Sequence, residues 1–586
     1  MSKIPERTFG WIQNPSNFSN LKKTVAVFLY DSPVNLRLRT DLLPRLIQDE
    51  TVRNTFISEL SRSEIVIPYE HLKGKGKGSA PSRKEALCSG IVQAVIHSQG
   101  EKEYTDDWTA DGFLRWGVSL GFIEYNHEND CCQITESGKE FVLSEEDSER
   151  EKELLGNAFL SYPPVIRILS LLDKNGDQTK FELGAQLGFI GEAGFTSIPQ
   201  NLYVAALCQA EGKERTDIQS KVEGSSDKYA RMIAKWLAKM GWIVSKDKIV
   251  TESLGNKTFQ TRLQAYEITL EGRRNLKHAQ GNSSSARIPR RVFYEMLATK
   301  ATDKNYLRQR RAYLIQYLAK RRSCEEIQKF FQKKGISVQP VAIRDEIESL
   351  ERIGLNIRNF HDNTYMVMDE IVGLSIPKTA KTMENTKLSD LTTLKENVRE
   401  KLTHLNHKYL LLLDLAQDKD SSRDFEIQTA DLLTNELQFS GTVLGGPRRP
   451  DSVVSYGENG IIIDNKAYKE GFSIPIHQAD EMIRYINDNN KRDPELNPNR
   501  WWEHFDSQVV NFYYLFVSSF FTGNFKRQLE YITRQTEQKN GFVHTIGGGA
   551  VAVVNLLYLA ENLKSGKMQY KDCFSLFQND EIVISL

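Results

Sequence analysis

The chain of 586 residues carries 77 Lys and Arg side chains against 77 Asp and Glu, which gives a formal net charge of zero. One hydrophobic core rarely grows beyond roughly 250 residues, so this length predicts about three to five domains. The composition, 40% hydrophobic and 26% charged, is typical of a folded protein. No apolar run reaches the ~18 residues of a membrane span, and the first residues lack the apolar core of an export signal. We therefore expect a cytoplasmic protein without a membrane partner.

Cysteine usage argues against a zinc site or a disulfide framework. The six cysteines include no Cys-x-x-Cys pair, which is the spacing typical of zinc ligands. A reducing compartment fits this pattern.

The first predicted domain, residues 1–147, contains a glycine- and lysine-rich loop at 73–79. The loop lacks the Gly-x-x-x-x-Gly-Lys-Ser/Thr spacing of nucleotide-binding loops, which excludes that function. A flexible cationic loop suits a phosphate backbone, and a disordered surface loop is the alternative. Two helices are expected next, over residues 83–98 and from Asp107 to the glycine at 121.

One pattern recurs along the first two thirds of the chain: a helix, a glycine stop, a strand, a turn and a second strand. This order is typical of a winged helix-turn-helix module. Such modules also mediate protein–protein contacts, but three in one chain favour DNA recognition in the major groove. The pattern occurs over residues 107–135, 228–270 and 343–368.

Two joints divide the chain further. A Gly/Ser-rich stretch at 281–286 is typical of a flexible joint, and residues 287–322 after it are strongly basic. Because arginine pairs well with phosphates and carboxylates, we expect this basic stretch to contact nucleic acid or an acidic domain. The predicted domains are residues 1–147, 148–282 and 286–375, a linker at 376–387, and a last domain at 388–586.

The last domain contains a hairpin that carries chemistry. Asp451 follows a proline at the start of one short apolar run, and Asp464 and Lys466 end the next run, after a Gly-rich turn. Residues two apart on a strand point to the same face. Two carboxylates suit Mg²⁺, which leaves its other positions to water and phosphate oxygens, and the amine can orient water or stabilise developing charge. A solvated surface hairpin is the alternative.

Strands alternate with helices around this hairpin, which predicts an α/β domain. A helix over residues 424–437 carries Glu426, and a helix over residues 477–487 places Asp480 and Arg484 four apart. This spacing fits a pair on a helix surface or half of a symmetric dimer contact.

These features, in this order, resemble the FokI-like type IIS restriction endonucleases, whose cleavage domain belongs to the PD-(D/E)xK superfamily. The resemblance implies mainly α, winged helix-turn-helix-like DNA-recognition subdomains, followed by an α/β nuclease domain with a central mixed sheet. The matching segments are residues 7–15, 111–116, 121–125, 161–164, 194–197, 223–232, 295–299, 444–446, 449–451, 466–468 and 478–482.

The resemblance also implies the chemistry. Asp451, Asp464 and the carbonyl of Asn465 would hold Mg²⁺, Lys466 would activate or orient water, and Glu426 would lie beside the site. The enzyme would bind a short asymmetric duplex, GGATG-like, and cut both strands at a fixed distance, leaving 5′-phosphates. One domain has one site, so two strands imply a homodimer through Asp480 and Arg484. A companion DNA methyltransferase in the same bacterial system is implied, although not as a physical partner.

Base-contacting positions follow from the same resemblance. Arg and Lys pair with guanine, Asn and Gln with adenine, and Glu with cytosine. Four departures are notable: Ser220 replaces an asparagine, Ser452 a glycine, Asn465 a threonine and Ser519 a glycine. The implied DNA-binding residues are Asn14, Arg83, Gln99, Trp108, Ser220, Glu223, Lys228 and Arg231.

Two other functions compete with this one. A sequence-specific DNA-binding regulator would have a silent cleavage domain, which the intact Asp451, Asp464 and Lys466 argue against. A sequence-independent repair nuclease would not need three reading modules.

Overall fold

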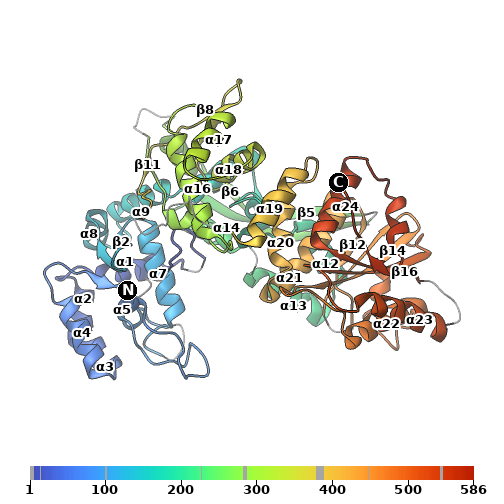
Figure 1. The fold of residues 1–586 in the computed structure, drawn as a ribbon. Helices are drawn as coiled ribbons and strands as arrows, with labels where there is room; N and C mark the ends of the chain where they lie inside the picture. Colours follow the sequence, from blue (N-terminus) through green and yellow to red (C-terminus); the bar gives the residue numbers. More distant parts are fainter. Residues whose placement is uncertain are drawn as a thin grey trace.

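The computed structural model describes residues 6–13, 15–98, 102–225, 227–255, 257–281, 287–377, 388–446, 448–540 and 545–586. Figure 1 shows an elongated molecule in which the chain runs from the blue N-terminal end to the red C-terminal end. The gold helices between them join a largely helical N-terminal part to a domain built on a sheet.

The N-terminal region packs helices around a three-stranded antiparallel sheet. A helix was expected over residues 83–98, but only α6 (Ile91–Val95) is helical there. The chain is extended at Gly90 because a Cβ at this position would lie 2.5 Å from the backbone nitrogen of Gly74. The helix predicted from Asp107 is confirmed. The other elements are α1 (Phe18–Ala26), α2 (Pro33–Arg37), α3 (Leu43–Leu46), α4 (Glu50–Leu60), α5 (Tyr69–Lys73), α7 (Asp107–Ser119), α8 (Glu136–Leu143), β1 (Ile67–Pro68), β2 (Ile123–Asn126) and β3 (Cys131–Ile134).

The second region has the predicted helix, glycine stop and long hairpin. Strands β5 (Ile243–Leu254) and β6 (Lys257–Ile268) are antiparallel over their full length. Asp227, at the N-cap of the following helix α14, is left-handed at φ 50°, and its side chain accepts a 2.6 Å bond from Ser197. The remaining elements are α9 (Glu149–Ser161), α10 (Pro163–Asn175), β4 (Gln178–Thr179), α11 (Lys180–Gly184), α12 (Gln200–Gln209), α13 (Gly212–Ser225), α14 (Lys228–Lys239) and α15 (Leu270–Ala279).

The third region repeats the pattern on a smaller scale. Helix α18 stops at Gly354, and an antiparallel pair follows. The predicted third module therefore has the expected order of elements. They are β7 (Arg290–Arg291), α16 (Lys304–Tyr317), β8 (Arg322–Ser323), α17 (Cys324–Lys333), α18 (Pro340–Arg352), β9 (Ile357–Asn359), β10 (Thr364–Val367) and β11 (Ile371–Val372).

The basic stretch at the start of this module is partly internal. Arg310 and Arg311 are buried and both pair with the buried Glu346. Arg310 also lies 3.4 Å from Glu396, and Arg311 lies 2.6 Å from Glu192. Of the two expected contacts, these buried arginines therefore make the one with acidic partners, on carboxylates that come from distant parts of the chain, and not the one with nucleic acid.

The C-terminal domain has the predicted mixed sheet, which is built of six strands. The strand order is β12-β13-β14-β15-β16-β17, antiparallel up to β14 and parallel after it. Ile461 and Ile463 pack on one face with α20 and α24, while Ile462 packs on the other face with α22 and α23. The elements are α19 (Asp390–Lys401), α20 (Leu412–Leu415), α21 (Ser422–Asp431), β12 (Ser440–Val443), β13 (Ser452–Tyr456), β14 (Asn459–Lys466), α22 (Ile476–Lys491), β15 (Asn511–Ser518), α23 (Phe525–Asn540), β16 (Thr545–Ala552), α24 (Val553–Lys564) and β17 (Asp580–Glu581).

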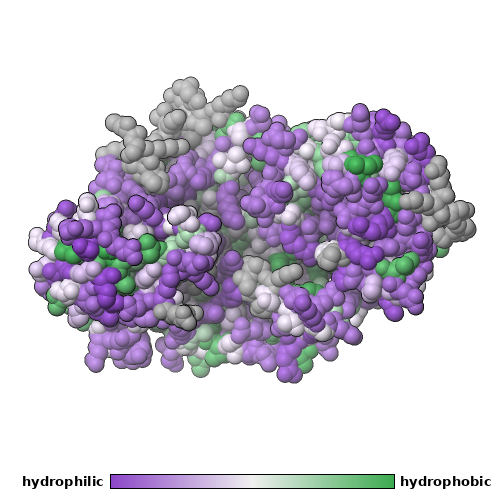
Figure 2. All heavy atoms as spheres, turned by 90° about the horizontal axis from the view of Figure 1, so that it is seen from below, coloured by the Kyte–Doolittle hydropathy of each residue, from purple (hydrophilic) through white to green (hydrophobic). Residues whose placement is uncertain are grey.

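The face of the molecule in Figure 2 is mostly hydrophilic, with hydrophobic side chains scattered in small groups. Over the described residues, no single helix is long and apolar enough to cross a membrane. Helices α9 and α10 pass that test only as a pair, and they are bent by 86° at the break between them.

Candidate active site and DNA-reading surface

The candidate active site lies at the end of the β13–β14 hairpin. The hairpin itself is confirmed, with Tyr456 opposite Asn459. Asp464 is buried, and its Oδ1 lies 2.6 Å from Nζ of Lys466. Asp451 accepts a 2.6 Å bond from the backbone nitrogen of Asn465 through Oδ2. The fold thus brings two carboxylates and one amine from the hairpin into one small cleft.

Glu426 enters the same cleft from α21. Its Oε2 accepts a 2.5 Å bond from Arg423. Burial raises the pKa of Glu426, which the Arg423 charge opposes, and the negative charge of Asp464 raises it further. Glu426 is therefore close enough to the hairpin carboxylates to be repelled by them.

The charges in the cleft are strongly coupled. Burial raises the pKa of Asp451 well above its ordinary value, and the charges of Asp464 and Glu426 raise it further. Burial lowers the pKa of Lys466, but Asp464 and Asp451 more than offset this, so its net pKa is raised. Lys466, with Arg423 at Glu426, balances the three crowded carboxylates only in part, and a divalent cation would relieve their remaining repulsion.

The cleft suits a hard divalent cation. Oδ2 of Asp464 is buried and has no hydrogen-bond partner among the described residues. Among the residues that the structure describes, no group of three or more Asp, Glu, His or Cys side chains is arranged to hold a metal by itself. An ion here would therefore take Asp464 and Asp451 together with main-chain, water or phosphate oxygens, which is the usual environment of Mg²⁺.

The structure adds residues that the sequence did not single out. Glu481 of α22 contributes to raising the pKa of Lys466, and Glu481 accepts a 3.0 Å bond from Tyr485. Ser518, at the end of β15, donates a 2.6 Å bond to the carbonyl of Lys466. The Ser518 contact joins positions 52 apart, and Glu481 acts on Lys466 from a different element, so no local pattern could have revealed either.

The residues of the predicted dimer contact lie together on α22. Arg484 pairs with Glu481 at 3.0 Å. Asp480 accepts a 3.4 Å bond from Tyr531 of α23. Both side chains lie on the surface, and each has a partner within its own domain.

Predicted base-contacting residues gather in the N-terminal region. Arg83 lies over the half-exposed ring of Trp108 at 5.2 Å. Arg83 also lines a cavity of about 730 Å³ with Pro15 and Ser98. Pro15 and Ser98 are the chain neighbours of Asn14 and Gln99. Asn14, Gln99 and the side chain of Glu223 lie outside the described residues.

The N-terminal arm connects this surface to α14. Gln13 donates a 2.9 Å bond to Tyr229, and Trp236 donates a 3.0 Å bond to the carbonyl of Pro15. Lys228 and Arg231 occupy the first turn of α14. Helix starts are where recognition helices contact base edges, and the arm is bonded to one such helix, α14. Ser220 is exposed on α13.

The recognition regions dock directly on the catalytic domain. Leu202 and Leu254 pack against Ile427 and Val443 in a small apolar cluster. Gln428 donates a 2.8 Å bond to the carbonyl of Ser197. Ile427 and Gln428 follow Glu426 on α21, so one helix serves both the active site and this contact.

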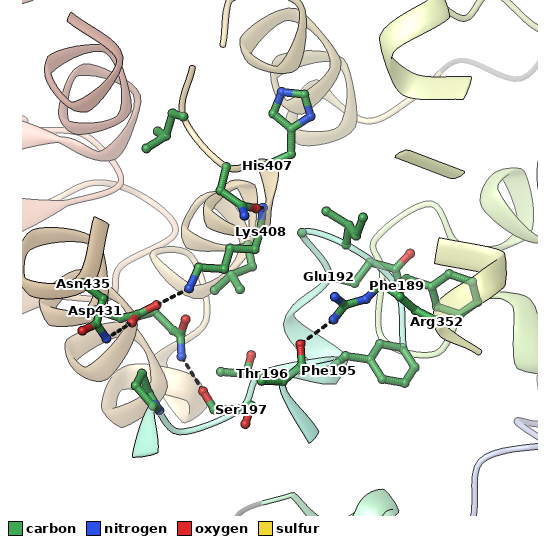
Figure 3. A pocket seen from close by; sticks show the side chains of 18 of the residues that line it. Phe189, Glu192, Phe195, Thr196, Ser197, Arg352, His407, Lys408, Asp431 and Asn435 are labelled. Carbon is green, nitrogen blue, oxygen red and sulfur yellow. Dashed lines mark hydrogen bonds and ion pairs between the residues drawn. The ribbon is translucent and has the colours of Figure 1, made fainter. Parts of the chain in front are cut away.

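Polar contacts surround a large cavity along the same boundary, about 1150 Å³ in volume. Figure 3 shows Lys408 bonded to Asp431 on the catalytic side. On the recognition side it shows Ser197, whose carbonyl accepts the bond from Gln428. His407 lies at the rim: its Nδ1 is 2.8 Å from Asp345 of α18, and its Nε2 is 2.9 Å from the carbonyl of Leu402. Because both ring nitrogens face acceptors, both need a proton, and the imidazolium form fits this contact.

The contact at His407 predicts pH-dependent docking. Burial lowers the pKa of His407, but the bond to Asp345, the negative charge of Asp345 and the bond to the carbonyl of Leu402 together outweigh it, so the net pKa is raised above 6.5. Protonated His407 therefore stabilises the docked form fully below its ordinary pKa, and this stabilisation is lost as the pH rises through the raised pKa. The free energy lost is about 1.4 kcal/mol for each pH unit between the two pKa values. Scattering measurements on the DNA-free protein between pH 6 and 9 should show expansion at the alkaline end. A His407→Gln variant that expands over the same pH range would contradict this explanation.

The fold and the site together define an endonuclease joined to helical reading modules. Family models for FokI match residues 7–144 (recognition domain, subdomain 1), 151–284 (subdomain 2), 297–363 (D3 domain) and 389–584 (cleavage domain). The chain is 38% identical over 593 residues to the type II restriction enzyme FokI of Planomicrobium okeanokoites, covering 99% of this chain and 100% of that one. It therefore belongs to the FokI family of type IIS restriction endonucleases.

Other similarities agree with this assignment. The type II restriction enzyme StsI of Streptococcus sanguinis is 30% identical over 591 residues, covering 97% of this chain and 95% of that one. The structures of FokI alone and of FokI bound to DNA superpose with TM-scores of 0.90 and 0.91, each at 36% identity and over 99% of this chain and 100% of that one. Membership of this family implies a nuclease that depends on a divalent metal.

Proposed function

We propose that the protein binds a short asymmetric duplex DNA site, GGATG-like, and cuts both strands at a fixed distance from it with Mg²⁺, leaving 5′-phosphates. The meeting of Asp451, Asp464 and Lys466 at one hairpin end carries the proposal. The division of labour is that residues 1–375 read DNA and residues 388–586 cut it. Its substrate places the enzyme in the bacterial cytoplasm, where a companion methyltransferase must protect the host site.

In the proposed reaction Asp451 and Asp464 hold the cation, with the carbonyl of Asn465 as a further ligand. When bound, Mg²⁺ supplies positive charge to the scissile phosphate and makes water a better nucleophile. The raised pKa of Lys466 keeps its amine protonated, which suits orientation of water and stabilisation of charge more than removal of a proton. Glu426 adds negative charge beside the metal position.

The reading surface supports recognition of specific bases. Asn14, Arg83, Gln99, Trp108, Ser220, Glu223, Lys228 and Arg231 are the proposed contacts. Serine at position 220 is shorter than the asparagine expected there and cannot make a bidentate contact with adenine. One base pair of the site is therefore read less strictly.

Sequencing the ends left by digestion of a randomised duplex library with Mg²⁺ tests the whole proposal. Ends at a constant offset from one asymmetric motif support it and name the site. Scattered ends point to a nuclease without sequence preference. Intact DNA that is nevertheless bound points to a regulator with a silent cleavage domain.

Recognition and backbone binding are expected to separate by mutation. Lys228→Ala should reduce the difference in binding free energy between the correct and a wrong base pair at one position by about 1–3 kcal/mol. Lys75→Ala and Lys77→Ala remove exposed cations of the glycine-rich loop, so each should weaken binding to every sequence and lower the salt slope by about 1. Binding titrations on specific and random duplexes over a range of salt concentrations measure both effects. Equal loss of specificity in the two classes would contradict the division.

Dimerisation of cleavage domains is expected to be needed for cutting both strands. Asp480→Arg reverses a surface charge on α22 and should leave DNA affinity intact while slowing double-strand cutting roughly tenfold or more, because like charges facing each other cost several kcal/mol. The matched control is Asp572→Arg, also exposed but outside α22. Unchanged cutting by the Asp480 variant would remove the dimer from the proposal.

A further inference from the structure

Arg449 lies two residues before Asp451, in the segment that leads into the catalytic hairpin. Two residues of chain span at most about 7 Å, so Arg449 borders the candidate cleavage site. Its guanidinium pairs with the carboxylate of Glu214, 235 positions away, and donates a 2.9 Å bond to Asn499. An arginine beside the catalytic aspartates is therefore held by a residue of the recognition part.

Glu214 occupies the first turn of α13, the helix that also carries Ser220. Its side chain is 43% exposed, whereas that of Arg449 is 19% exposed. The ion pair therefore runs from a helix proposed to read DNA to the segment that enters the active site.

The surroundings of this pair are positively charged. The pKa of His504 is lowered to about 4. Burial is the main cause, and the charges of Lys257 and Arg449 add to it while the charge of Glu214 opposes it. Lys257 comes from the start of β6 and donates a 3.4 Å bond to the carbonyl of Glu503. Arg449 and Lys257 are cations of the kind that bind a DNA phosphate. The carboxylate of Glu214, which pairs with Arg449, carries negative charge where such a phosphate would lie.

We propose that Glu214 occupies the place of a DNA phosphate: it holds Arg449 while the two parts are docked, and Arg449 binds the backbone of the strand to be cut once the cleavage domain leaves α13. The inference rests on the proposed function. A partly exposed ion pair is weak and exchangeable, whereas arginine binds phosphate through two charge-assisted bonds. The exchange therefore favours the DNA-engaged state.

Three full-length variants test the inference: Glu214→Gln, Arg449→Gln and the double variant. Cleavage rates are measured at saturating enzyme on a cognate duplex, and affinity is measured without divalent metal. Glu214→Gln should raise the rate roughly fivefold or more, as expected of a typical coupling between sites. Arg449→Gln should lower it roughly tenfold or more, and the double variant should be as slow as Arg449→Gln. DNA affinity should change little in all three.

The opposite signs of the two single variants distinguish a phosphate-binding arginine from a mere clamp. If the pair only holds the two parts together, both variants undock the domain and both speed cutting, which would overturn the inference. Asp217→Asn removes an exposed carboxylate from the same helix and is expected to have no effect; a gain equal to that of Glu214→Gln would also overturn it. Arg449→Lys keeps the charge and should restore part of the rate, which excludes misfolding as the cause. A wild-type protein that makes no cuts in this assay would instead contradict the proposed function.

Discussion

Replacing Asp464 with alanine is expected to abolish cleavage while leaving DNA binding intact. Asp464 is buried, its Oδ1 pairs with Lys466, and its Oδ2 is left without a partner among the described residues. Loss of a carboxylate that is proposed to hold the metal and that pairs with the lysine should reduce the rate by roughly 10³-fold or more. Single-turnover cleavage with Mg²⁺ measures the rate, and gel-shift titration in EDTA measures the affinity.

The matched control is Asp506→Ala, which removes a carboxylate bonded to Ser440 and Ser455 at the far end of the sheet. It should cost some stability and little activity. A cleavage rate for the Asp464 variant within tenfold of the wild type would show that the catalytic cluster has been assigned to the wrong residues. The Asp464 variant leaves the ammonium of Lys466 without its carboxylate partner in a buried position. The thermal unfolding of both variants should therefore be recorded, so that loss of stability is not mistaken for loss of activity.

The second large effect is expected from pH. The pKa of Asp451 is raised well above its ordinary value by burial and by Asp464 and Glu426, and a carboxylate must lose its proton before it can bind metal. Below the raised pKa, the Mg²⁺ concentration needed for half-maximal cutting should rise about tenfold for each pH unit. Cleavage at limiting Mg²⁺ should therefore fall steeply on acidification, while at saturating Mg²⁺ the fall should begin at lower pH.

The sign of this effect can be checked on folding. A raised pKa means that ionised Asp451 destabilises the metal-free fold, so its cost is absent at low pH and grows as pH rises from the ordinary Asp value. Asp451→Asn removes that cost. In EDTA at neutral pH this variant should unfold at a higher temperature than the wild type, and Mg²⁺ should no longer stabilise it. A variant less stable than the wild type in EDTA would contradict the electrostatic account.

Local sequence patterns predicted the elements that depend on near neighbours. The catalytic hairpin follows from two apolar runs and a Gly-containing turn, and the three helix–glycine–hairpin units follow from periodicity and glycine stops. The same reasoning failed at residues 83–98, where the close approach of Gly74 and Gly90 breaks the expected helix. For Arg310 and Arg311 it left nucleic acid and an acidic partner both open, because counting charges does not reveal that Glu346 and Glu192 lie beside them.

The parts of the site that depend on distant residues were not predictable. Glu481 reaches the cleft from α22, and Glu214 reaches Arg449 across 235 residues. Neither has a local pattern to mark it, because surface glutamates on helices are common. Only the packing of one part on another gives these carboxylates their neighbours.

Strand β12 forms the outer edge of the catalytic sheet. An edge strand presents unpaired backbone groups that can template the addition of a foreign strand. Here the tip of the β5–β6 hairpin lies against that edge, so closely that a Cβ on Gly255 would meet the side chain of Ser440. The release proposed above would therefore uncover this edge. The brevity of β12, which has four residues, limits how much of it a neighbouring chain could pair with before the domain returns.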